Sequence, residues 1–406
     1  MDNPFFQEVE FYDRHQEFNF FSHQITMFSL RQYLLSAEEP DDLFRTLDKI
    51  KFERNSRGEL CYSVGNAAVT FRVLIAGERR ALRCYFHPSP RLKRIYQTEY
   101  LEREFFIHDT PPHGRWVDVV LTRWVEGEEL GSIISRAAKA GDKALLASLS
   151  KRFDQLGRDL LDAPWAHGDL KPENIILDTE GELQLIDRDA MFLPEMQGEL
   201  ATELGTAAYQ HSARTTEDFD ATIDDFSVAL ISTALYALSL DPTLYERFGG
   251  RDGLLIDAQH PTADEALQAI LACFAHRGEA VRYRIARTLL RRRPGTLPCR
   301  EWMHLLGKPF AAADGQIPEL YFSNEGLWGF RTDDKVVIPP LYDGGYDFTE
   351  GVAAVRLAKT WHFINLRGEV VLSCPPCVDV KPFREGRATL YTEQECYEID
   401  IRGQRL

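Results

Sequence analysis

The sequence has no apolar run long enough to cross a membrane as a helix. A spanning helix needs about 20 apolar residues, whereas the best candidate, Val228 to Leu240, is thirteen residues long and contains two serines and a threonine. We interpret it as a buried core helix. The start of the chain also lacks the basic region of a signal peptide and carries acidic residues instead. We therefore expect a cytoplasmic protein with no membrane partner.

Positive charge is scarce. The chain has 47 Lys and Arg against 63 Asp and Glu, a formal net charge of −16. This balance argues against general binding to nucleic acid or to an anionic membrane. The local exception is a run of six arginines from Arg282 to Arg293, followed by Pro294. We interpret that run as a solvated helix end, where cations favour the negative end of the helix dipole.

Cysteine is too sparse for a disulfide scaffold, with seven in 406 residues, and this fits a reduced cytoplasm. Cys374 and Cys377 have C-x-x-C spacing, but a structural zinc site needs two more ligands. Cys396 is the only later cysteine, and no histidine follows. We interpret the spacing as incidental.

The chain is long enough for two or three domains. The pattern predicts an N-terminal helical extension over 1–50, a β-rich region over 51–125 and a mainly helical region over 126–306. Gly, Pro and Ala then indicate a linker over 307–320, and short strands between turns fill 321–406.

Within 51–125, alternating apolar residues predict a hairpin whose strands end near Ile75 and Tyr85, with a turn at Gly77. A helix is expected from Arg91 to about Phe106, and a further strand over 116–123.

The segment with the clearest chemistry is AHGDLKPENIILDTEGELQLIDRDAMF, residues 166–192. A turn carries Asp169, Lys171 and Asn174, and a predicted ribbon then returns the chain to Asp187. Phosphoryl transfer from Mg-ATP needs a carboxylate near the acceptor hydroxyl, oxygen ligands for magnesium and a cation near the phosphate. These four residues supply all three.

This segment resembles the catalytic loop H-R-D-x-K-x-x-N and the metal-binding D-F-G of protein kinases. The resemblance implies an α+β, two-lobed fold with a small β-rich N-lobe and a helical C-lobe. It also implies Asp169 as catalytic base, Lys171 as phosphate contact, and Asn174 and Asp187 as magnesium ligands, with ATP as cosubstrate.

Other segments extend the resemblance over about 60–306. GTAAYQH, from Gly205, resembles the end of an activation segment. DDFSVAL resembles the start of the central C-lobe helix, where Asp224 would accept hydrogen bonds from the catalytic-loop backbone. GNAAVTF, from Gly65, stands where the phosphate loop belongs, and Trp124 begins the hinge.

Two departures concern phosphate binding. Arg83, in ALRCY, replaces the strand lysine that contacts the α- and β-phosphates, and arginine is longer and planar. Its expected partner is a glutamate on the next helix, where Glu99 and Glu102 would lie one turn apart; we prefer Glu102. The phosphate loop keeps only Gly65 of its glycines.

Two further departures concern regulation. D-F-G has become Asp187-Arg188-Asp189, and Gly168 replaces the arginine that usually pairs with a phosphorylated activation loop. We therefore expect any activity to be independent of loop phosphorylation. Alanine at Thr206, Thr215 and Thr216 should leave it intact.

After residue 320 two strings recur at an offset of 33 to 35 residues, beginning at Leu327 and Thr360. Such a period is typical of stacked structural repeats. The strings resemble WG repeats, a bacterial β-repeat family, although His362 replaces the glycine in the second copy. The resemblance implies a β-rich interaction domain. The corresponding residues are Trp328 and Trp361, Phe330 and Phe363, and Glu350 and Glu385.

Three functions remain open. The chain is a bacterial-type protein Ser/Thr kinase that uses Mg-ATP, a pseudokinase that acts as a scaffold through its WG repeats, or a small-molecule kinase, since HGD also occurs in aminoglycoside-kinase-like enzymes. The first two imply an unidentified protein substrate or partner, which the WG repeats could contact.

Overall fold

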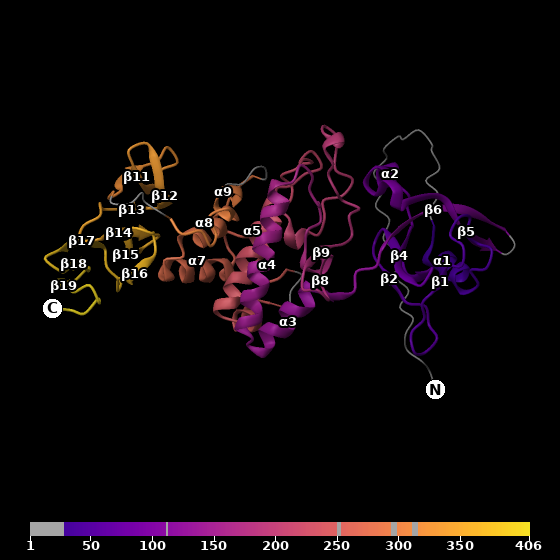
Figure 1. Cartoon of the computed structure of the whole chain (residues 1–406), viewed down its shortest axis with the longest axis horizontal. Helices are drawn as coiled ribbons and strands as arrows, with labels where there is room; N and C mark the ends of the chain where they lie inside the picture. Colours follow the sequence, from indigo (N-terminus) through magenta and orange to yellow (C-terminus); the bar gives the residue numbers. More distant parts are fainter. Residues whose placement is uncertain (1–27, 111–112, 250–252, 294–298, 311–315) are drawn as a thin grey trace. The chain divides into compact units, whose positions relative to one another are not determined.

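The structure is a computed structural model that describes residues 28–110, 113–249, 253–293, 299–310 and 316–406. The chain divides into two compact units, residues 1–124 and 125–406, which we describe separately (Figure 1). Among the described residues, no helix is long and apolar enough to cross a membrane.

The first unit is built on an antiparallel sheet in the order β1-β3-β4-β6-β5, with β2 paired to β3. The predicted hairpin is β3 and β4, whose inward-facing Val69, Phe71 and Leu82 are fully buried. The strands are β1 (Lys51–Phe52), β2 (Tyr62–Val64), β3 (Ala68–Ile75), β4 (Glu78–Tyr85), β5 (Tyr100–Thr110) and β6 (His113–Arg123).

One helix of the N-terminal extension lies within the described residues. Helix α1 (Leu30–Glu38) begins with a capping box in which Ser29 and Gln32 satisfy each other's backbone N–H groups. Its Tyr33 is fully buried and donates its hydroxyl to the carbonyl of Tyr85 (2.7 Å), which fixes the helix on the sheet. Residues 39–50 form turns rather than helix, and 1–27 lie outside the described residues.

The predicted helix from Arg91 to Phe106 is wrong over most of its length. Helix α2 covers only Pro90–Tyr96, and Gln97 then takes a positive φ of 49° that ends it. Residues 100–110 instead form β5, in which the buried Phe105 and Ile107 flank the more exposed Phe106. Tertiary pairing with β6 decides the conformation here, because the short apolar run fits either period.

The second unit begins with the helical region. The predicted buried helix is α5 (Asp225–Leu240), which is apolar on all sides and almost wholly buried. Residues 187–224 contain only short 3-10 turns. The other helices are α3 (Leu130–Ala140), α4 (Lys143–Asp162), α6 (Leu244–Phe248), α7 (Glu265–Arg277), α8 (Ala280–Thr288) and α9 (Cys299–Met303). A small sheet contains β7 (Gly127–Glu129), β8 (Ile175–Asp178) and β9 (Leu183–Leu185).

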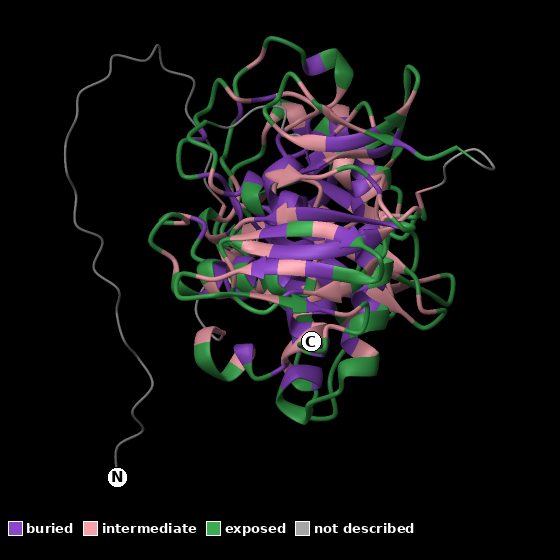
Figure 2. Cartoon of the chain, turned by 90° about the vertical axis from the view of Figure 1, so that its left-hand side faces the viewer, coloured by how far each residue is buried: buried purple, intermediate pink, exposed green. Residues whose placement is uncertain are grey.

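The C-terminal region consists of three small antiparallel sheets. Figure 2 looks onto this region and shows buried segments along its strands. Corresponding residues of the two copies occupy equivalent turns: Glu350 and Glu385 both have positive φ, and each precedes a glycine. The strands are β10 (Glu319–Phe322), β11 (Trp328–Thr332), β12 (Lys335–Tyr342), β13 (Gly344–Gly345), β14 (Val352–Leu357), β15 (Thr360–Asn365), β16 (Val370–Ser373), β17 (Asp379–Arg384), β18 (Arg387–Tyr391) and β19 (Cys396–Ile399).

The helical region and the first strands share one hydrophobic core. Buried Ile285 and Leu289 of the helical region belong to the same cluster as buried Phe330, Ile338 and Leu341 of the strands. Phe310, in the predicted linker, also packs against this cluster. The strand region is therefore docked on the helices rather than loosely tethered.

The predicted solvated end at Arg282–Arg293 is wrong for its first two arginines. Arg282 is 9% exposed and donates to the buried carboxylate of Asp154 (2.5 and 3.1 Å) and to Ser232. Arg284 is 4% exposed and donates to the carbonyl of Leu341 (2.6 and 2.7 Å). These side chains join α8 to α4 and α5 on one side and to β12 on the other.

Candidate active site

Asp224, at the N-cap of α5, holds the start of the loop at residues 167–174. Its carboxylate is 3% exposed and accepts the backbone N–H groups of His167 (2.5 Å) and Gly168 (2.9 Å). The predicted contact between Asp224 and the loop backbone is therefore confirmed. A buried carboxylate that accepts two backbone donors fixes the loop at its base.

His167 and Gly168 fix the conformation of the loop. The fully buried His167 contacts the carbonyl of Ile186 through Nε2 (2.8 Å), which ties the loop to the end of the ribbon. Gly168 has a φ of +82°, and a Cβ there would lie 2.1 Å from the carbonyl oxygen of Ala190. A side chain at position 168 therefore cannot fit without moving the backbone.

Asp169 lies at the centre of converging donors. Its Oδ1 accepts the backbone N–H of Thr206 (2.6 Å), and its Oδ2 lies 3.1 Å from both the Asn174 amide nitrogen and Lys171 Nζ. The side chain is 18% exposed, so part of the carboxylate reaches solvent. The structure thus brings together Asp169, Lys171 and Asn174.

Asn174 closes the short 3-10 turn η2 (Pro172–Asn174) and is 5% exposed. Its amide nitrogen donates to the Asp169 carbonyl (2.8 Å) and contacts the Asp169 carboxylate, so its amide oxygen points away from Asp169. The backbone N–H of Ile186 donates to the Asn174 carbonyl (3.0 Å), which brings the next residue, Asp187, near Asn174. Asp187 has a φ of +58°, an uncommon geometry that often marks functional sites.

Thr206 also contacts the site, and this contact was not predicted from the sequence. Its hydroxyl accepts a hydrogen bond from Lys171 Nζ (2.8 Å), while its N–H donates to Asp169. Alanine at position 206 would remove a site contact, so the test of phosphorylation dependence is confined to Thr215 and Thr216. No periodicity pointed to Thr206; its only signal was its position next to Gly205.

The remaining predicted residues lie in the first unit. Gly65 starts the β2–β3 turn and donates its N–H to the Ala68 carbonyl (2.9 Å). It does not have positive φ, and a Cβ there would find only that carbonyl, at 3.8 Å. Arg83 lies in β4 opposite Thr70 and Val120, with its guanidinium 5.6 Å from the ring centre of Tyr85.

Glu102 does not occupy the predicted helix face. It lies in β5, is exposed, and forms an ion pair with Lys93. The choice of Glu102 as partner of Arg83 depended on a helix that is absent at this position. The buried glutamate of β5 is instead Glu104, which is 1% exposed and accepts hydrogen bonds from the N–H groups of Thr46 and Leu47 (2.8 Å each).

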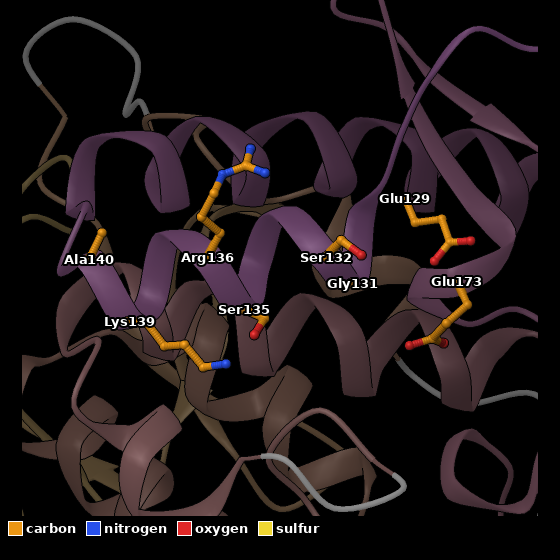
Figure 3. Close-up of a pocket in the computed structure, with 8 residues that line it drawn as sticks. All are labelled: Glu129, Gly131, Ser132, Ser135, Arg136, Lys139, Ala140 and Glu173. Atoms are coloured by element: carbon orange, nitrogen blue, oxygen red, sulfur yellow. The ribbon is translucent and has the colours of Figure 1, made fainter. Parts of the chain in front are cut away.

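An open depression of about 750 Å³ adjoins the loop of the second unit. Figure 3 shows that it runs along α3, with Glu129 and Glu173 at one end. Glu173 lies in η2, next to Asn174. The turn η2 therefore contributes both to the depression and to the loop at residues 167–174. The charged and hydroxyl-bearing residues that line it are Glu129, Ser132, Ser135, Arg136, Lys139 and Glu173.

The described residues contain no cluster of three or more His, Cys, Asp or Glu that could hold a metal ion. The predicted magnesium ligands are a different case, because an Asn–Asp pair relies on phosphate and water oxygens to complete the coordination shell.

Comparison with known proteins identifies one family in the C-terminal region. Residues 330–361 match the model of the WG containing repeat, which confirms the predicted repeat there. The matched stretch runs from β11 to the start of β15. No curated protein matches the chain.

Proposed function

We propose that the chain transfers the γ-phosphoryl group of Mg-ATP to a serine or threonine hydroxyl of another protein. In this proposal the first unit corresponds to the small β-rich lobe of a kinase, and the helical region of the second unit corresponds to the large lobe. The observation that carries the proposal is the convergence of Lys171, Asn174 and Thr206 on the Asp169 carboxylate.

Asp169 is the base in this proposal. Its carboxylate would accept the proton of the attacking hydroxyl, and the donors around it hold it in one orientation. Lys171, 3.1 Å from that carboxylate, provides a cation for the charge on the transferring group. Thr206 fixes the lysine through its hydroxyl.

The donor set fits magnesium and nucleotide. Asn174 carries an amide oxygen and Asp187 a carboxylate, and oxygen is the ligand that magnesium prefers. When bound, the metal ion neutralises charge on the phosphates. Within the first unit, the resemblance to kinases assigns phosphate contacts to Gly65 and Arg83, and Arg83 keeps the charge of the lysine it replaces.

The open depression supports a protein acceptor. Small-molecule sites are usually enclosed and mostly apolar, whereas this surface is open and lined by charges of both signs. An extended peptide with mixed polarity suits it better. The aminoglycoside-kinase-like alternative is therefore less favoured, and the WG repeats remain a candidate surface for recruiting a protein partner.

The pseudokinase alternative has its own support. The Gly65 turn lacks the left-handed backbone that only glycine tolerates well, and Arg83 and Asp187-Arg188-Asp189 depart from the kinase pattern. In this alternative the loop around Asp169 is a structural remnant, and the chain acts through its WG repeats.

The test is transfer of labelled γ-phosphate to the chain itself and to a mixed pool of serine- and threonine-containing peptides. Asp169→Asn should lower the rate by about 10²- to 10⁴-fold, because removal of a general base has that effect. Asp159→Asn is the matched control, since Asp159 is exposed on α4, and should retain the wild-type rate. Equal rates for wild type and Asp169→Asn would exclude Asp169 as base.

A further inference from the structure

Arg214 is a buried arginine next to the candidate loop. It is 8% exposed, and its Nη1 lies 3.2 Å from the carbonyl oxygens of both Gly168 and Leu204. The same nitrogen donates to the side-chain oxygen of Gln210. Arg214 thus contacts the loop at Gly168 and two points of the segment 204–214.

This placement is energetically expensive. Arg214 Nε and Nη2 are buried and make no hydrogen bond within the described part of the chain, and buried unpaired donors cost free energy. Burial lowers the pKa of the guanidinium, while the nearby carboxylates of Asp224, Asp218 and Asp169 act in the opposite direction. A cation kept at such a cost suggests a role beyond stability.

Gly168 has no side chain with which to hold the neighbouring segment. A Cβ at this position would lie 2.1 Å from the carbonyl oxygen of Ala190. Gly205 is equally constrained: its φ is +71°, and a Cβ would lie 2.7 Å from the Gly168 carbonyl oxygen. The segment 204–214 therefore packs directly on the loop.

We propose that Arg214 is a positioning residue that latches the segment 204–214 onto the loop, so that the site is assembled in the unphosphorylated chain. The latch acts through Gly168 and Leu204, and it places Thr206 against Asp169 and Lys171. This inference rests on the proposed function for its catalytic consequence, but not for the latch itself.

The first measurement is amide hydrogen exchange in the full chain, shown to be unphosphorylated by mass spectrometry. Arg214→Gln should raise the amide exchange rate in the segment 204–214 at least tenfold. The exchange rate in Arg214→Lys should lie between those of Arg214→Gln and the wild type. Arg284→Gln is the matched control, because Arg284 is also buried and donates to a carbonyl. That control should leave the segment protected. Unchanged exchange in Arg214→Gln would overturn the latch.

The second measurement is phosphoryl transfer. Arg214→Gln should lower kcat at least tenfold with little change in KM for ATP, and Thr215→Ala with Thr216→Ala should leave kcat unchanged. Activity that appears only after phosphorylation of the segment would also overturn the proposal. If the wild-type chain transfers no phosphate, the proposed function fails, while the exchange experiment still tests the latch.

Discussion

Gly168 and Gly65 belong to the same candidate site by sequence, yet their surroundings differ. Gly168 needs left-handed backbone and leaves no space for a methyl group, whereas Gly65 has an ordinary φ and open surroundings. One glycine is required by the fold of the loop. The other could be required only by what binds beside it.

The stabilities of the Gly168→Ala and Gly65→Ala variants distinguish a glycine required by the fold from one that is not. Gly168→Ala should cost roughly 1–3 kcal/mol from backbone strain alone, with a further loss from the clash, whereas Gly65→Ala should stay within about 0.5 kcal/mol. Urea denaturation of both variants measures this difference. Equal losses would show that the loop relaxes around the methyl group.

The sequence predicted which residues the loop brings together, but not which residues of other segments contact the loop. Asp169, Lys171 and Asn174 lie in one turn, so their spacing already places them together. Thr206 and Arg214 reach the loop from an irregular segment whose course depends on tertiary contacts. Their roles therefore could not be obtained from local patterns.

At the scale of elements, the predictions were wrong where the spacing of apolar residues fitted both a helix and a strand. Residues 100–110 form a strand because they pair with β6, although their apolar residues also fit a helix. The arginines from Arg282 onward were expected at a solvated helix end, where cations favour the negative end of the helix dipole. Arg282 and Arg284 are buried because Asp154 and the Leu341 carbonyl accept their hydrogen bonds.

His362 joins the repeat region to α7. It stands where the repeat pattern has glycine, is 1% exposed, and donates Nε2–H to the carbonyl of Ala275 (2.8 Å), with Nδ1 at 2.9 Å from the Ser373 hydroxyl. Ala275 lies in the last turn of α7, where its carbonyl also accepts the backbone N–H of the cap residue Gly278 (3.2 Å). Burial, with a smaller effect of His276, lowers the pKa of His362.

This lowered pKa predicts a pH dependence of stability. Below an ordinary histidine pKa of about 6.5, His362 binds a proton in the unfolded chain but not in the folded chain. The free energy of unfolding therefore decreases as the pH is lowered from about 6.5 to the lower pKa of folded His362. The slope from one such group is at most about 1.4 kcal/mol per pH unit.

Denaturant titrations at pH 7.5 and 5.5 measure the effect. His362→Gln can still donate to Ala275 but does not titrate, so its stability should fall less between the two pH values than that of the wild type. All other groups are common to both proteins, so their effects cancel in the comparison. Identical losses would assign the pH dependence to other groups.

At the scale of the whole molecule, the repeats extend the helical region of the second unit. The two regions share one core around Leu341 and Ile285, and Arg284 and His362 connect them through hydrogen bonds to carbonyls. The sequence predicted the repeats from their period, and the family match confirms the first. Their docking could not be predicted, because it depends on contacts between residues far apart in the sequence, such as Arg284 with Leu341 and His362 with Ala275.

Thermal unfolding with and without Mg-ATP tests the proposed binding of Mg-ATP through Asn174 and Asp187. Ligand at a hundred times its Kd should stabilise the folded state by about 2.7 kcal/mol. Asp187→Asn should abolish the magnesium-dependent rise in Tm, since asparagine tolerates positive φ but lacks the charge. Exposed Asp159→Asn should retain the rise. If millimolar Mg-ATP does not shift the Tm of the wild type, the chain does not bind Mg-ATP as proposed.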